Sequence, residues 1–202
     1  IVDCEWRDIM GFQIAGIAIL LLFYGCYLIK MMSQWKKGIK TDQIGKGKTG
    51  PVKTIELTMK AATYTVLATE IISIALNISY CETAVRIAGT LIAATGVAIF
   101  IVSVWTMQDS WRAGVAKTEK TRLITGGIYQ MSRNPAFLGF DLLYIGIAMM
   151  FFHWVLLVIS LFAIVMLHLQ IVKVEENFLM EVFGEEYRGY RQKVCRYWGR
   201  KR

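Results

Sequence analysis

Long apolar segments alternate with shorter polar ones along most of the chain. Five windows are almost free of charged side chains, at residues 9–29, 61–78, 84–107, 136–152 and 154–172. A helix needs roughly 20 apolar residues to cross the hydrocarbon core of a bilayer, and these windows are close to that length. The pattern therefore predicts an all-α, polytopic membrane protein with about five transmembrane helices.

The polar connections predict how the last helices are arranged. Only Phe152-His153-Trp154 separates the fourth window from the fifth, so we expect helices 4 and 5 to form a tight antiparallel hairpin. Beyond residue 172 the apolar side chains recur at helical spacing, which predicts that helix 5 continues into a cytoplasmic C-terminal helical extension. Gly184 is expected to break this extension. Its apolar face consists of Phe178, Leu179, Val182 and Phe183.

Charge sets the expected orientation in the membrane. The chain has 202 residues, 55% of them hydrophobic, and a formal net charge of +8. The lysines and arginines gather in residues 30–60, 112–133 and 173–202, which five helices would place on one side of the bilayer. Because basic loops stay in the cytoplasm, we expect the N-terminus outside and the C-terminus inside. The membrane would be the cell membrane in a prokaryote or the endoplasmic reticulum in a eukaryote. No aromatic platform is interleaved with the basic residues, so nucleic acid is not an expected partner.

The chain is expected to form a single membrane domain over residues 1–202. Residues 1–107 would hold the first three helices, with a basic cytoplasmic loop at 30–60. This loop contains Gly45-Lys-Gly-Lys-Thr-Gly50, which fits the G-x-G-x-x-G pattern of dinucleotide sites. Such a fingerprint must follow a buried strand, and a lysine-rich loop precedes this one. We interpret it as part of a flexible loop.

A polar, glycine-rich run between two apolar windows is the most informative stretch. It reads Ile124-Thr-Gly-Gly-Ile-Tyr-Gln-Met-Ser-Arg-Asn-Pro-Ala-Phe-Leu-Gly139. Asn134 in the N-cap position and Pro135 at the first helical position predict a helix start. Its unpaired N–H groups and partial positive charge suit an anionic ligand group, and Arg133 adds a cation with forked donors. If the chain then crosses the membrane and returns, Arg133 meets Glu175-Glu176 on one face.

The side chains expected on this face suit binding better than hydrolysis. They include Tyr129, Phe137, Arg133 and two carboxylates, without a Ser-His-Asp set or a cysteine paired with a base. His153 and His168 stand alone, so no metal site is expected. A zwitterionic ligand with an aromatic part fits this inventory, and S-adenosylmethionine has both features. Methyl transfer then requires mainly the alignment of two reactants in a dry pocket.

Three motifs in a fixed order carry a resemblance to a known family. Gly126-Gly-Ile-Tyr-x-x-Ser-Arg-Asn-Pro-x-Phe-Leu-Gly139 follows Ser110-Trp-Arg-x-Gly114 and precedes Glu175-Glu-x-x-Leu-x-x-x-Phe-Gly-x-x-Tyr-x-x-Tyr190. Over residues 108–196 the chain resembles the isoprenylcysteine carboxyl methyltransferase and phospholipid methyltransferase family. The resemblance implies an integral membrane methyltransferase that uses S-adenosylmethionine and releases S-adenosylhomocysteine. The cofactor would lie beneath the cytoplasmic ends of the last helices, so residues 108–202 are the expected cofactor-binding core.

The resemblance also implies roles for individual residues. The commoner form of the motif reads Arg-His-Pro-x-Tyr, so this chain departs from it at Asn134 and Phe137. The cofactor site would be lined by Gly127, Ile128, Tyr129, Arg133, Asn134, Phe137, Leu138, Glu175 and Glu176. Near the methyl acceptor we predict Trp111, Arg112 and Arg191 as catalytic-site residues. The acceptor would be a lipophilic or lipidated molecule that arrives from the bilayer, of the prenylcysteine carboxylate or phospholipid amine type.

Two other functions fit parts of the pattern. An NADPH-dependent membrane sterol-type reductase shares the Arg-x-Pro helix start, but the acidic Glu175-Glu176 pair is unfavourable for a 2′-phosphate. A non-enzymatic membrane scaffold or small transporter subunit would use Glu70 and Asp141, which lie inside predicted helices. A structural role for Glu70 stays open as well. Cys4 and Cys81 would share the outer face, and the sequence leaves a disulfide between them open.

Overall fold

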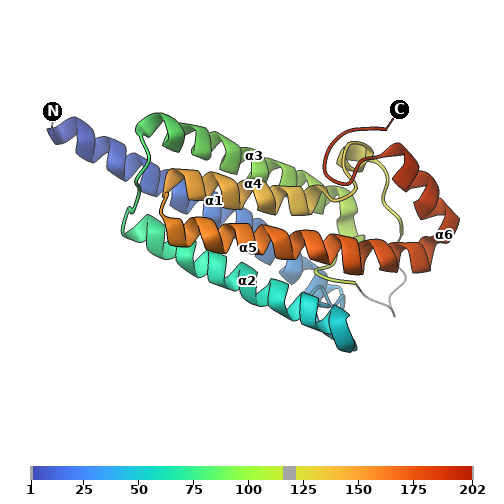
Figure 1. The fold of residues 1–202 in the computed structure, drawn as a ribbon. Coiled ribbons are helices and arrows are strands. Elements are labelled where there is room, and N and C mark those ends of the chain that lie inside the picture. The colour runs from blue at the N-terminus through green and yellow to red at the C-terminus, as the bar shows by residue number, and fades with distance from the viewer. Residues whose placement is uncertain (1, 116–121, 202) are drawn as a thin grey trace.

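The structure is a computed structural model that describes residues 2–115 and 122–201, with side chains from residue 10 onwards. Its regular structure is helical: α1 (Val2–Lys36), α2 (Gly50–Ala75), α3 (Thr83–Met107), α4 (Pro135–Met150), α5 (Trp154–Gln170) and α6 (Glu176–Lys193). Helices α1 to α5 run side by side in one long bundle, and α6 extends past its end and bends back (Figure 1). The predicted all-α fold is confirmed.

Three helical segments of the described structure have the length and apolar composition that membrane crossing requires. Within the described residues, Met10–Lys36, Thr83–Ser110 and Trp154–Lys193 are helical segments long and apolar enough to cross a bilayer. Pro135–Met150 is a shorter apolar helix. The chain is thus an all-helical, polytopic membrane protein.

Helix α1 continues past the end of its apolar window, and α2 begins before the start of its own. α1 continues to Lys36 and α2 begins at Gly50, about three turns before the expected start. The additional turns contain charged residues such as Lys53, Glu56 and Lys60. Hydropathy detects where a helix leaves the hydrocarbon, whereas backbone hydrogen bonding continues into the polar region. The basic loop is therefore shorter than the predicted 30–60.

Helices α3 and α4 pack at backbone contact, as the small residues of α3 suggested. A methyl group added at Gly146 would lie 2.5 Å from the Ala93 nitrogen, and one added at Gly89 would lie 2.6 Å from the Gly146 carbonyl oxygen. Without side chains at these positions the two helices approach closely and gain dispersion contacts. This seam holds the start of α4 against the middle of the bundle.

Polar and aromatic contacts stabilise the end of the bundle that carries the α4–α5 turn. His153 lies between α4 and α5, where its Nδ1 accepts from the Leu156 N–H at 3.3 Å and its Nε2 contacts Ser73 Oγ at 2.8 Å. The Arg86 guanidinium lies over the ring of Phe12 at 4.2 Å from its centroid. The bond from the Leu156 N–H gives His153 a capping role at the start of α5.

The buried acids and the cysteines have varied surroundings. Glu70 is fully buried between helices, as expected for an acid that faces protein, and neither carboxylate oxygen has a hydrogen-bond partner within the described structure. Asp141 is also buried, with Oδ1 unpaired there. Cys81 is a free thiol. The disulfide with Cys4 that the sequence left open is therefore not formed at Cys81 in this structure, and the Cys4 side chain lies outside the described residues.

The α3–α4 seam makes the first prediction. Gly146→Ala forces a methyl group against the Ala93 backbone, so we expect the free energy of unfolding to fall by about 1–3 kcal/mol. Thermal unfolding in detergent measures the change. Gly25→Ala in α1 is the matched control, because a methyl group there meets nothing within 4 Å. Equal stability of the two variants would contradict the backbone contact.

Candidate functional site

The helix that carries the two neighbouring glutamates changes its winding at this pair: Glu175 ends a π-helical stretch and Glu176 begins an α-helix. α5 ends at Gln170, residues Ile171–Glu175 form a π-helical stretch (η3), and α6 begins at Glu176. A π-helical turn shifts the register of a helix and is frequent at functional sites. Here the two consecutive carboxylates contact different groups.

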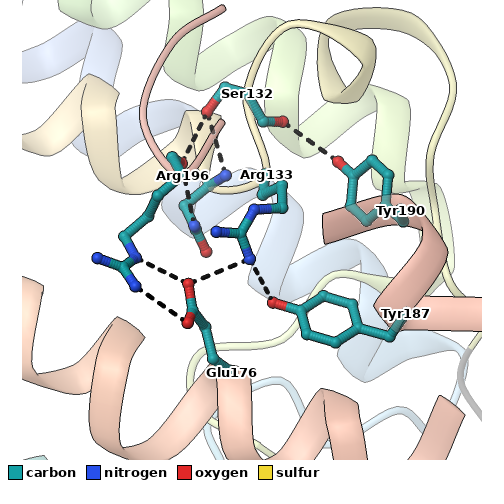
Figure 2. Close-up of polar contacts among 7 residues, drawn as sticks. Ser132, Arg133, Glu176, Tyr187, Tyr190 and Arg196 are labelled. Atoms are coloured by element: carbon teal, nitrogen blue, oxygen red, sulfur yellow. Dashed lines mark hydrogen bonds and ion pairs between the residues drawn. The ribbon is translucent and has the colours of Figure 1, made fainter. Parts of the chain in front are cut away.

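Glu176 is buried between two guanidinium groups (Figure 2). Its Oε1 accepts from Arg196 Nε at 2.7 Å and lies 3.1 Å from Arg133 Nη1, and its Oε2 accepts from Arg196 Nη2 at 3.1 Å. Arg133 Nη1 also donates to the Tyr187 hydroxyl at 2.8 Å. The expected meeting of Arg133 with the glutamate pair is therefore observed, and it involves Glu176. These bonds engage both oxygens of Glu176, which leaves little capacity for a ligand.

The segment after α6 folds back over the start of α4. The Arg133 N–H donates to the Cys195 carbonyl at 3.1 Å, and the Gly199 N–H donates to the Met131 carbonyl at 2.6 Å. Asn134 occupies the predicted N-cap position, but its Nδ2 donates to the Arg196 carbonyl at 3.1 Å and its side chain does not cap α4. The expectation that Asn134 caps the helix is wrong in this respect, because the tail uses its side chain.

Gly184 allows α6 to bring its second half to this network. Its φ of 48° lies in the left-handed region, where the helix bends, as the sequence predicted. After the bend, Tyr190 donates to the Tyr129 carbonyl at 2.6 Å.

Burial raises the pKa of the Tyr129 phenol, so this side chain stays neutral at physiological pH. It can act as a hydrogen-bond donor or an aromatic surface, and a role as base is disfavoured.

A cavity of about 130 Å³ lies beside this network, and we call it the small cavity. All three motifs contribute to its lining, which includes Trp111, Arg112, Tyr129, Arg133, Asn134, Phe137 and Glu175. Arg133 Nε is buried and has no hydrogen-bond partner within the described structure. An unpaired buried donor of this kind can bind an anionic ligand group.

The other predicted site residues are not among those that line the small cavity. Gly127 is exposed at the start of the short helix η2 (Gly127–Gln130), Ile128 and Leu138 are half-buried, and Arg191 is exposed on α6. Glu176 belongs to the ion-pair network. The geometry thus separates residues that face the cavity from residues that build its surroundings.

A second, larger cavity of about 360 Å³ lies between α1, α2, α4 and α5, and we call it the large cavity. Much of its wall is apolar, with Leu28, Met31 and Leu67 among the lining residues. Its charged lining residues are Asp42, Lys60, Arg112 and Glu175, and Thr63, Gln170 and three tyrosines add neutral polar groups. The two cavities share Trp111, Arg112, Gly114, Ala136, Phe137 and Glu175.

The loop between α1 and α2 holds the shared wall in place. Gln34 Nε2 donates to the Trp111 carbonyl at 2.9 Å, and Thr41 Oγ1 donates to Gln34 Oε1 at 2.7 Å. The Ala113 N–H donates to the Thr41 carbonyl at 3.0 Å. These bonds join the Ser-Trp-Arg motif to the N-terminal half of the chain, which the sequence pattern did not indicate.

Asp42 at the large cavity is anionic at neutral pH. Burial alone would raise the pKa of its carboxyl, but hydrogen bonds from Lys60 and from the Ile44 N–H lower the pKa below its usual value. Lys60 Nζ lies 2.8 Å from Asp42 Oδ2. The polar end of the cavity therefore contains a paired anion and cation.

Comparison with known proteins places this chain in a family. The model of the phospholipid methyltransferase family matches residues 84–186, about half of the chain. The chain belongs to the phospholipid methyltransferase family. The matched region runs from the start of α3 through the first turns of α6, so it contains the motif loop and both glutamates. Helices α1 and α2 and the C-terminal tail lie outside it.

One curated relative is similar over part of its length. Protein-S-isoprenylcysteine O-methyltransferase from Saccharomyces cerevisiae is 35% identical over 83 residues, which cover 40% of this chain and 35% of the yeast protein. The matched part thus spans about a third of the yeast relative. The family and this relative agree with the resemblance that the motifs carry.

Sequence reasoning missed several residues of the network around Glu176. Tyr187 and Tyr190 belong to the motif that begins at Glu175, so their spacing offered a signal. Arg196 and Ser132 had no comparable pattern, since Arg196 is one of many basic residues near the C-terminus. Its role becomes visible only when the tail reaches Glu176.

The network predicts how the tail responds to a single change. Arg196→Gln removes both bonds to Glu176, so we expect amide hydrogen exchange in residues 194–201 to accelerate at least tenfold, about 1.4 kcal/mol. Exchange measured by mass spectrometry tests this. Arg188→Gln is the control, because Arg188 pairs with the exposed Glu185 and such surface pairs contribute little. An unchanged exchange rate in the Arg196 variant would contradict the anchoring role.

Proposed function

We propose that this protein is an integral membrane methyltransferase that uses S-adenosylmethionine to methylate a lipophilic acceptor. The acceptor is of the prenylcysteine carboxylate or phospholipid amine type. The observation that carries the proposal is the wall common to the small and large cavities, which contains Trp111, Arg112, Phe137 and Glu175. Because these residues border both cavities, a reactant bound in one cavity would lie next to a reactant bound in the other.

The lining of the small cavity suits the chemical groups of S-adenosylmethionine, and its volume of about 130 Å³ would hold part of the cofactor, because pockets for whole ligands measure about 300–1,000 Å³. The unpaired buried Nε of Arg133 suits the carboxylate of the cofactor. Glu175 suits the amine or a ribose hydroxyl, because Glu176 is already engaged by Arg133 and Arg196. Tyr129 and Phe137 offer aromatic surface for adenine. When bound, S-adenosylmethionine supplies an electrophilic methyl group on a cationic sulfur.

The residues of the shared wall would act mainly by alignment and by excluding water. Oriented reactants in a closed site gain much of the rate that a solution reaction lacks. The carboxylate of Glu175 would favour the cationic end of the cofactor electrostatically. An acceptor that is already a carboxylate has no proton to lose. An amine acceptor must lose one, and Glu175 is the acidic side chain of the shared wall that could accept it.

The large cavity fits an acceptor with an apolar tail and a polar head. Leu28 and Tyr64 line it and are also largely exposed on the outer surface of α1 and α2, which supports arrival from the bilayer. Lys60 and Arg112 suit an anionic head group such as a carboxylate or phosphate. Arg191 is exposed and lines neither cavity, so it has no part in the contacts that we propose.

We further propose five crossings, with α4 and α5 as a tight hairpin and with the N-terminus outside. The two termini lie at opposite ends of the bundle, as an odd number of crossings requires (Figure 1). Exposed aromatic residues support the two interfaces, with Trp35 and Trp105 near one end and Tyr80 and Trp154 near the other. The basic loops support a cytoplasmic position for the site.

Binding of the demethylated product tests the cofactor site. We expect S-adenosylhomocysteine, titrated into detergent-solubilised protein by calorimetry, to bind, and Glu175→Gln to weaken binding at least tenfold, about 1.4 kcal/mol. Glu186→Gln on the exposed face of α6 is the control and should bind as the original protein does. Binding of NADPH instead would favour the reductase, and binding of neither would favour a scaffold.

Filling the large cavity tests the acceptor site. Thr63→Trp projects an indole into this cavity, so we expect methyl transfer to a farnesylcysteine or phospholipid acceptor to fall at least tenfold, while S-adenosylhomocysteine affinity stays within about twofold. Thr65→Trp, on the exposed face of the same helix, is the control. Full activity of the Thr63 variant would contradict the acceptor site.

Sealed vesicles test the proposed orientation of the site. We expect activity with externally added S-adenosylmethionine only when the cytoplasmic face of the protein points outward.

A further inference from the structure

We propose that Lys48 and Glu56 are positioning residues for Glu175 and act on it through Gln170. The inference rests on the proposed function, in which Glu175 contacts the cofactor as an anion. Lys48 and Glu56 lie outside the region that matches the family, whereas Gln170 and Glu175 lie within it. The N-terminal half of this chain would thus control a group in the family's core.

The loop before α2 closes around the carboxylate of Glu56. Glu56 is fully buried in the second turn of α2, and its Oε2 accepts from the Gly45 N–H at 2.6 Å. Lys48 Nζ binds Glu56 Oε1, and the Lys48 side chain is only 7% exposed. The loop that the sequence suggested was flexible therefore holds a buried ion pair.

A single amide group connects this ion pair to the proposed cofactor site. Gln170 is fully buried at the end of α5, where its Nε2 donates to Glu56 Oε1 at 3.4 Å. Gln170 directly precedes the π-helical stretch that ends at Glu175, and both residues line the large cavity, so one π-helical turn of five residues places the two side chains next to each other. Gln170 Oε1 has no partner within the described residues, so the contacts of this side chain are made by its amino group. The amide thus lies next to two carboxylates, from α2 and η3.

This arrangement makes the charge of Lys48 necessary for the charge of Glu175. Two carboxylates beside one amide repel each other, and such a pair tends to retain a proton unless a cation compensates it. Lys48 is the cation bound directly to one of them. The other ionisable or charged groups of the two cavities come from α1, α2, α6 and the connecting segments: Tyr24, Tyr27, Asp42, Lys60, Tyr64, Arg112, Arg122, Tyr129, Arg133 and Tyr190.

A simple ion pair that fastens the loop to α2 is the competing explanation, and the sign of a pH shift separates the two. Lys48→Met removes the compensating cation, so Glu175 should ionise less readily. Glu56→Gln removes the competing anion and leaves Lys48, so Glu175 should ionise more readily. A fastening role predicts that both variants lose stability and that neither shifts the pH profile.

The experiment measures S-adenosylhomocysteine affinity of the full-length protein by calorimetry between about pH 5 and 9. We expect Lys48→Met to move the pH of half-maximal affinity upward by about one unit and Glu56→Gln to move it downward. The double variant Lys48→Met/Glu56→Gln should return it to within about half a unit of the original value. Lys46→Met is the control, since Lys46 is exposed and donates to the Asp42 carbonyl at 2.6 Å rather than to Glu56.

Each outcome is informative. Opposite shifts that cancel in the double variant support the positioning role, and coincident profiles for all variants overturn it. If Lys48→Met alone fails to fold, the downward shift of Glu56→Gln and the restored profile of the double variant decide. Absence of S-adenosylhomocysteine binding by the original protein at every pH would instead overturn the proposed function.

Discussion

The carboxylate of Glu176 holds together three parts of the chain that are far apart in sequence. It binds Arg133 from the loop before α4 and Arg196 from the tail after α6, while it starts α6 itself. A buried carboxylate is costly unless several charge-assisted hydrogen bonds compensate for lost hydration, and here two guanidinium groups provide them. Because Arg133 also lines the small cavity, this ion-pair network positions one wall of the proposed cofactor site.

Two adjacent glutamates have different surroundings, because consecutive residues of a helix point about 100° apart and the π-helical stretch ends between them. The π-helical stretch ends at Glu175, which lines both cavities, and Glu176 enters the ion-pair network. One carboxylate remains available to a ligand only because the other one satisfies the arginines. The arrangement also explains why the tail matters, since Arg196 supplies the second partner that fully engages Glu176.

The spacing between helices explains where the apolar cavity lies. Small residues allow α3 and α4 to touch at their backbones, while the wider spacing around α1 and α2 leaves room for the apolar cavity. Polar side chains such as Asp42, Lys60 and Gln170 line the cavity where the helices leave the apolar windows. An acceptor with a tail and a head group would therefore find matching surroundings along one path.

The sequence alone determined the helical membrane fold, the helix start at Pro135, the bend at Gly184 and the approach of Arg133 to the glutamate pair. These features depend on hydropathy, turn residues and the direction of successive helices, which are local or additive properties of the chain. Only the tertiary structure decided that Glu176 binds the two arginines, that Asn134 binds the tail and that Lys48 and Gln170 both contact Glu56. Such contacts join side chains from distant segments, and their partners follow from how the helices pack, which no local pattern encodes.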